Sequence, residues 1–181
     1  MTGKKVIRVA ASYPVLLGQA WHGWRLGRRA GAEHCARVFA GLPAQVPEAR
    51  AFASRALAGC PARETLMLCV TELCANAIEH TTSGAGGTFT VEIARPADGV
   101  AYVAVTDAGG DEWTIPDPGR PTADADVAEL AEGGRGLALV AACSSRWGYE
   151  KAAGSASECT VWAEATWPVP VRAGYVGKQA V

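Results

Sequence analysis

Several features that mark common protein classes are missing from this sequence of 181 residues. No uninterrupted apolar run approaches the roughly 18 residues that a membrane-spanning helix needs, because charged residues, Gly or Pro interrupt every run. The six cysteines show no Cys-x-x-Cys spacing and lie mostly inside apolar segments, which favours buried free thiols over disulfides. These absences predict a soluble protein in a reducing cytoplasm.

Acidic side chains are absent from residues 1–32, which hold six of the 17 Lys and Arg residues. The whole chain has a net charge of -1, so the remaining residues together carry -7. An acidic body argues against a duplex-binding groove, since neutralising phosphates needs clustered Lys and Arg. We expect residues 1–31 to be a solvated, poorly ordered extension. Contact with nucleic acid or anionic lipid and a signal peptide are the alternatives.

Hydrophobic residues make up 49% of the chain, which is ample for one core. We expect one domain over residues 32–167, followed by a C-terminal tail at 168–181. Residues 107–132 are rich in Gly, Pro and Asp and predict a long loop. Periodicity and turn signals predict strands at 35–39, 89–94, 100–106, 146–150 and 159–165, and helices at 46–57, 62–81 and 133–141.

The helix predicted over residues 62–81 carries a first candidate motif, Glu72 and Asn76. Apolar residues recur at i, i+3, i+4, i+7 and i+11 from Leu66, and a helical wheel puts Glu72 and Asn76 at the border of that core face. Being four residues apart, they can converge on one ligand. An Asn oxygen suits Mg²⁺, and a Glu one turn away can deprotonate a hydroxyl. An ordinary polar helix flank is the alternative.

A second motif, Asp107-Ala108-Gly109, directly follows a predicted strand, where ligand loops are common. An ionised Asp only accepts hydrogen bonds, so it can recognise the exocyclic amine of adenine. The glycine lets the backbone approach the ring closely. A common Asp-x-Gly turn that binds nothing is the alternative.

A third motif, EGGRGL at residues 132–137, places a glycine-rich turn at the start of a helix. Free N–H groups and the helix dipole favour phosphate there, and Arg135 can add a charge-assisted contact. A structural turn without a ligand is the alternative. The sequence has neither a G-x-x-x-x-G-K-[ST] P-loop nor G-x-G-x-x-G after a strand, so those two phosphate loops are excluded.

In their order and spacing the three motifs resemble the N box and the two glycine boxes of the Bergerat-fold (GHKL) ATPases, which include gyrase and the histidine kinases. The segments VTELCANAIEH, GGRGLALV and CTVWAEA look most like small actinobacterial ATP-binding proteins related to anti-sigma-factor serine/threonine kinases. The resemblance covers about residues 35–166. It implies an α+β two-layer sandwich, with helices on one face of a mixed, mostly antiparallel sheet, ATP between helices and a flexible lid.

The resemblance also implies roles for single residues. Glu72 becomes the general base, Asn76 the Mg²⁺ ligand and Asp107 the residue that recognises adenine. The usual second glycine of the Asp-x-Gly-x-Gly turn is Asp111 here, and an acidic side chain there either weakens nucleotide binding or points outward. The other implied ATP-binding residues are His80, Gly109, Gly134, Arg135, Gly136, Leu137 and Thr160, the last a hydroxyl near adenine.

The function implied by the resemblance is that of an ATP- and Mg²⁺-dependent serine/threonine kinase in transcription regulation. It would sequester a sigma factor and phosphorylate an anti-anti-sigma protein of the STAS type, acting through the added charge. No direct contact with nucleic acid or membrane is expected, and a homodimer is left open. One alternative is a non-catalytic binding module in which ATP only sets the shape of the surface that binds a partner. The other is a histidine-kinase-type ATPase domain, which we expect to lack room upstream for a helical dimerisation domain.

Overall fold

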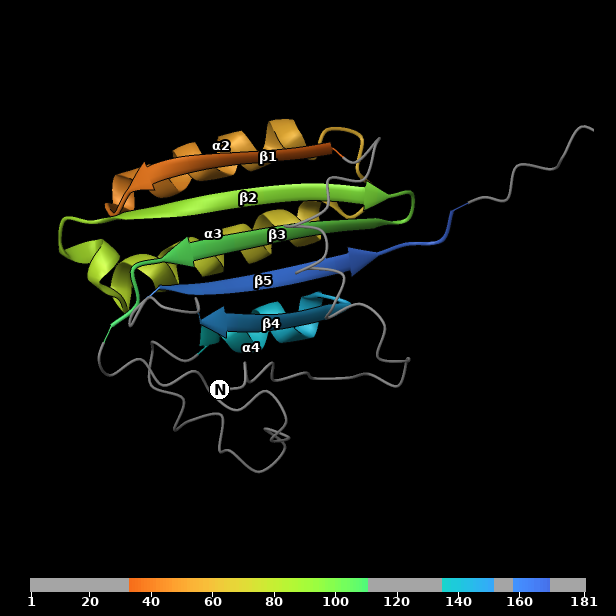
Figure 1. The fold of residues 1–181 in the computed structure, drawn as a ribbon. Helices are drawn as coiled ribbons and strands as arrows, with labels where there is room; N and C mark the ends of the chain where they lie inside the picture. The colour runs from red at the N-terminus through yellow and green to blue at the C-terminus, as the bar shows by residue number, and fades with distance from the viewer. Residues whose placement is uncertain (1–32, 111–134, 152–157, 170–181) are drawn as a thin grey trace, which may run out of the picture.

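The computed structural model describes residues 33–110, 135–151 and 158–169. The predicted extension at 1–31, most of the predicted loop at 107–132 and most of the tail lie outside these residues, as do Asp111 and Gly134. The described residues form one sheet with helices packed on one of its faces (Figure 1). In chain order the elements are β1 (Glu33–Ala40), the short 3-10 helix η1 (Pro43–Gln45), α2 (Val46–Ala56), α3 (Arg63–Glu79), the 3-10 helix η2 (Thr82–Ala85), β2 (Thr88–Ala97), β3 (Val100–Asp107), α4 (Arg135–Cys143), β4 (Arg146–Lys151) and β5 (Cys159–Thr166).

The sheet has five strands in the order β1-β2-β3-β5-β4. The predicted α+β class, with helices on one face, is confirmed. The expected mixed sheet is not observed, because all four pairings within the described residues are antiparallel. The path of the chain explains this. Helices α2 and α3 return the chain to the end where β1 stops, so Thr88 at the start of β2 pairs with Ala40 at the end of β1.

Helix α3 is the central helix, packed between α2 and α4 and against β2, β3 and β5. The core face predicted from the apolar spacing is confirmed, since all five of its residues are at most 2% exposed. They are Leu66, Cys69, Val70, Leu73 and Ala77. The helix ends one turn after Asn76, whose backbone carbonyl accepts the N–H of His80. Thr81 then begins the η2 turn, where its side chain accepts the N–H of Ser83.

The two faces of the sheet are both buried but differ in composition. On β3, Val103 and Val105 face the helices, and this side of the sheet is here called the inner face. The residues between them point to the opposite side, the outer face, because strand side chains alternate. The outer face holds a separate apolar cluster of Ala94, Tyr102, Ala104 and Trp162.

The six cysteines are free thiols, as the sequence predicted. Burial raises the pKa of the Cys69 thiol to about 11 and that of Cys74 to about 12, so both are protonated at neutral pH. Within the described ranges, no helix combines the length and the apolar character needed to cross a membrane.

Candidate nucleotide-binding site

Glu72 and Asn76 on α3 lie directly against the first turn of α4. A Cβ atom added to Gly136 would lie 3.0 Å from Glu72 Oε2 and 3.3 Å from Asn76 Oδ1. That spacing is tight for a Cβ, so glycine lets the α4 backbone lie against the two polar groups without moving them. The fold thus brings the first and third sequence motifs together.

Asn76 is the polar group that most clearly indicates a ligand. Its side chain is 8% exposed, and its Nδ2 atom is buried with no hydrogen-bond partner among the residues that the structure describes. A buried amide left unpaired costs about 1–3 kcal/mol. The N-terminus of α4 beside it carries backbone N–H groups that have no partner within the helix. An anionic ligand bound between α3 and α4 would satisfy both sets of groups.

The second motif forms the turn that the sequence predicted. Asp107 ends β3 and is 5% exposed, and its Oδ1 accepts the N–H of Gly109 at 2.7 Å. Gly109 has a φ of 66°, in the left-handed region that favours glycine. Burial raises the pKa of the Asp107 carboxyl to about 6, and the Gly109 N–H partly opposes this shift. The carboxylate is therefore held in a nearly dry position, ionised at neutral pH and able to accept a further hydrogen bond.

Residues of η2 fix the Asp107 turn to the end of α3. The hydroxyl of Ser83, which is 0% exposed, accepts the N–H of Ala108 at 3.0 Å and donates to the carbonyl of Thr88 at 2.8 Å. The backbone N–H of Thr82 donates to the Gly109 carbonyl at 2.7 Å, and its hydroxyl donates to the same oxygen at 3.0 Å. Sequence reasoning missed Ser83 and Thr82. The Ser and Thr residues before Gly84, a composition typical of turns, were the available signal.

Thr160 is not brought into this group. Its hydroxyl lies on the outer face, 2.8 Å from that of Thr106, its partner across the β3–β5 pair. The register places Cys159 opposite Asp107 instead, on the inner face and 1% exposed. Burial and then the charge of Asp107 raise the pKa of the Cys159 thiol to about 12. A neutral thiol thus lies beside the Asp107 carboxylate, and the Thr160 hydroxyl, which the resemblance placed near adenine, points to the other face of the sheet.

The remaining predicted residues, His80, Leu137 and Arg135, lie at helix ends or in the core. His80 is exposed and caps the C-terminus of α3. A Cβ added to Gly110 would lie 3.6 Å from the His80 carbonyl oxygen, so it is the His80 backbone that borders the Asp107 turn. Leu137 is 8% exposed and belongs to the hydrophobic core of the inner face. Arg135 is the first residue of α4.

The arrangement fits a nucleotide with Mg²⁺ better than a metal held by protein alone. No group of three or more His, Cys, Asp or Glu residues suited to a metal occurs in the part of the chain that the structure describes. Mg²⁺ in nucleotide sites takes most of its ligands from phosphates and water, so a single protein oxygen is sufficient. Asn76 has a side-chain oxygen beside the helix start that suits phosphate.

Comparison with known proteins gives a family for this chain. The family model described as "Histidine kinase-like ATPase domain" matches residues 39–162, which is more than half of the chain. The match contains all three motifs. Domains of this family bind ATP, usually with Mg²⁺. A search among curated proteins gave no match. The chain therefore belongs to the histidine kinase-like (GHKL) ATPase family.

Proposed function

We propose that this protein is an ATP- and Mg²⁺-dependent protein serine/threonine kinase that binds a sigma factor and phosphorylates an anti-anti-sigma partner of the STAS type. The observation that carries the catalytic part is the convergence of Glu72, Asn76 and Gly136, because a Cβ added to Gly136 would lie 3.0 Å from Glu72 Oε2 and 3.3 Å from Asn76 Oδ1. The choice of partners is supported by the resemblance of the three sequence segments.

Phosphoryl transfer requires three functions at the phosphate end of the site: binding of the phosphates, binding of Mg²⁺ and removal of a proton. The first turn of α4 binds phosphate oxygens through its free N–H groups, and Asn76 supplies an oxygen to Mg²⁺. Glu72 accepts the proton of the partner's serine hydroxyl as that oxygen attacks the γ-phosphorus. The new bond joins serine oxygen to phosphorus, the bond to the bridging β–γ oxygen breaks, and ADP leaves.

The Asp107 turn would hold the other end of the nucleotide. The turn is fixed to the end of α3 by Ser83 and Thr82, and α3 also carries Glu72 and Asn76. The Asp107 turn at the end of β3 is therefore held next to the C-terminal end of the helix that carries the reacting groups. Binding the base at Asp107 restricts where the phosphates lie along that helix, which favours transfer through positioning.

Transfer is tested with the full chain, labelled ATP, Mg²⁺ and the product of a neighbouring STAS gene. Glu72→Gln should keep ATP binding and lose transfer by about 10²–10⁴ in rate, the usual effect of removing a general base. Glu79→Gln is the matched control, since Glu79 is an exposed carboxylate on the same helix. It should transfer at the wild-type rate.

Two outcomes would contradict the proposal. If the wild-type protein phosphorylates no serine of any cognate STAS protein, the kinase assignment fails and a binding module controlled by nucleotide takes its place. If Glu72→Gln transfers at the wild-type rate, transfer is real but another residue is the base. Direct binding of the sigma factor, measured with and without ATP, tests the partner assignment separately.

A further inference from the structure

The outer face of the sheet carries an apolar cluster that faces away from every described helix. Ala94, Tyr102, Ala104 and Trp162 are at most 9% exposed, and the rings of Tyr102 and Trp162 pack edge to face with centroids 6.4 Å apart. The helices of the described residues all pack on the inner face (Figure 1). Large aromatic side chains on a sheet face stay this buried only when another part of a protein lies over them.

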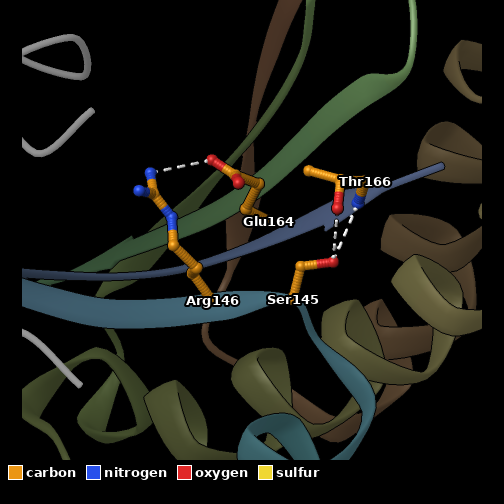
Figure 2. Close-up of polar contacts among 4 residues, drawn as sticks. All are labelled: Ser145, Arg146, Glu164 and Thr166. Atoms are coloured by element: carbon orange, nitrogen blue, oxygen red, sulfur yellow. Dashed lines mark hydrogen bonds and ion pairs between the residues drawn. The ribbon is translucent and has the colours of Figure 1, made fainter. Parts of the chain in front are cut away.

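Charged groups surround this cluster. Figure 2 shows Arg146 reaching from β4 to Glu164 on β5, with an Nη2 to Oε2 distance of 3.1 Å. Glu164 is only 2% exposed. The pKa of the Tyr102 hydroxyl is raised, first by its own burial and then by its hydrogen bond with Glu164. A second carboxylate, Glu92, is 9% exposed and lies 3.6 Å from His34. Two buried carboxylates thus face the same side of the sheet as the aromatic rings.

The covered area is narrow. Ala36 and Val38 on the edge strand β1 face the same side, yet both are exposed, Val38 to 61%. Burial is concentrated on β2, β3 and β5, a strip about 10–15 Å wide at the usual strand spacing. A single segment of chain suits such a strip, whereas a second copy laid over the whole face would also cover β1.

We propose that the strip is the docking surface of this chain's own N-terminal segment, residues 1–32. The segment joins the sheet at Glu33, the first residue of β1. Extended, 32 residues reach about 100 Å, so length does not limit where on the sheet it docks. The segment carries six positive and no negative side chains, opposite in sign to the two carboxylates of this face, of which Glu164 already pairs with Arg146.

Two further features fit this occupant. The Nε atom of Arg146 is buried without a hydrogen-bond acceptor in the described part of the chain, and a crossing backbone supplies carbonyl oxygens. Trp21 and Trp24 give the segment apolar surface to place against Tyr102 and Trp162. This proposal differs from the expectation from sequence alone, which was a solvated extension.

Hydroxyl-radical footprinting of the full chain tests the proposal with a built-in control. Trp162 and Trp147 lie on paired strands and are 9% and 7% exposed, but Trp162 belongs to the outer cluster and Trp147 to the inner core. In a variant in which the six basic residues of the segment are replaced by Gln, labelling of Trp162 and Tyr102 should rise several-fold. Labelling of Trp147 should stay at the wild-type level. Those residues are Lys4, Lys5, Arg8, Arg25, Arg28 and Arg29.

Unchanged labelling of Trp162 in this variant would overturn the proposal. If Trp147 is labelled more strongly as well, the variant has unfolded, and cross-linking of the wild-type protein decides. A carbodiimide should join Lys4 or Lys5 to Glu92 or Glu164 within one chain. If mixed isotope-labelled and unlabelled protein gives these cross-links only between chains, or gives none, a second copy or another partner covers the face and the segment does not.

Discussion

Both faces of the sheet hold buried polar side chains, but these side chains differ in whether a partner lies beside them. On the inner side, the buried polar residues Asn76 and Asp107 lie near the C-terminal ends of α3 and β3. On the outer face, Glu164 lies in the middle of an aromatic cluster and is paired with Arg146 at 3.1 Å. The described residues supply a partner for the Glu164 carboxylate but none for Asn76 Nδ2, and on the outer face they leave Arg146 Nε without an acceptor.

A buried polar group without a partner indicates a missing contact, whereas a paired one is a structural contact. The Nδ2 of Asn76 has no partner among the described residues, although burial makes an unpaired amide costly. A fold retains such a cost where binding or catalysis needs the group. The Glu164 carboxylate is already paired within the sheet, so it needs no nucleotide. Substitutions should therefore affect ATP affinity progressively less from Asn76 toward the outer face.

The largest loss of ATP affinity is expected for Asn76→Ala. Titration calorimetry with Mg²⁺ should show a decrease of about 100-fold or more, since the metal loses its protein ligand. Thermal unfolding should change little, because the substitution also removes a buried amide without a partner. The matched control is Leu73→Ala on the same helix, which should lose about 2–5 kcal/mol of stability. Unchanged affinity in Mg²⁺ would remove Asn76 from the metal site.

Asp107→Asn is expected to weaken ATP binding by about 10-fold, or about 1.4 kcal/mol. The amide can turn an N–H donor toward the amine of adenine, which the carboxylate accepts. The preference for ATP over GTP should shrink in parallel. Competition binding with the two nucleotides measures both effects. A variant that keeps affinity and preference would place the adenine contact elsewhere.

The pH dependence of the wild-type protein gives a second measure of Asp107. Because its pKa is raised from 3.8 to about 6, the folded state binds this proton more tightly than the unfolded chain. Its stability contribution is present below about pH 4 and is lost as pH rises to about 6. ATP affinity should change in the opposite sense and rise through about pH 6, as the carboxylate ionises. Both slopes should flatten in Asp107→Asn.

A smaller effect on ATP binding is expected for Ser83→Ala. The Ala108 N–H and the Thr88 carbonyl lose their buried partner, which should cost about 1–3 kcal/mol of stability. ATP affinity should fall by less than about 10-fold, because the turn loosens but Asp107 remains. Denaturant unfolding and calorimetry measure the two effects. In the control Ser144→Ala, which removes one bond to the Val140 carbonyl, affinity should not change.

No change in ATP affinity is expected for Glu164→Gln on the outer face. The variant should lose about 1–3 kcal/mol of stability, because a hydrogen bond between two charged groups becomes one to a neutral amide. Chemical unfolding measures the loss, and titration with ATP checks the affinity. A clear decrease in ATP affinity would show that the outer face contributes to nucleotide binding, which contradicts the expected difference between the two faces.

Much of the site was predictable where its geometry is local. Glu72 and Asn76 are four residues apart on a strongly periodic helix, so their common side followed from helical geometry alone. The Asp107 turn followed from its Asp-x-Gly sequence. Thr160 and Cys159 could not be separated in this way. Which of two adjacent strand residues stands beside Asp107 depends on register, and a shift of one residue exchanges the faces.

By itself, the sequence determined the helices, the strands and the three motifs, since apolar periodicity and turn chemistry depend on neighbours a few residues apart. Only the tertiary structure decided which distant groups meet. It placed Gly136 against Glu72 and Asn76, and Ser83 under the Asp107 turn. It also buried an apolar cluster on the outer face of the sheet, on β2, β3 and β5. Those contacts join residues that are 25 or more positions apart, and packing and strand register select among them.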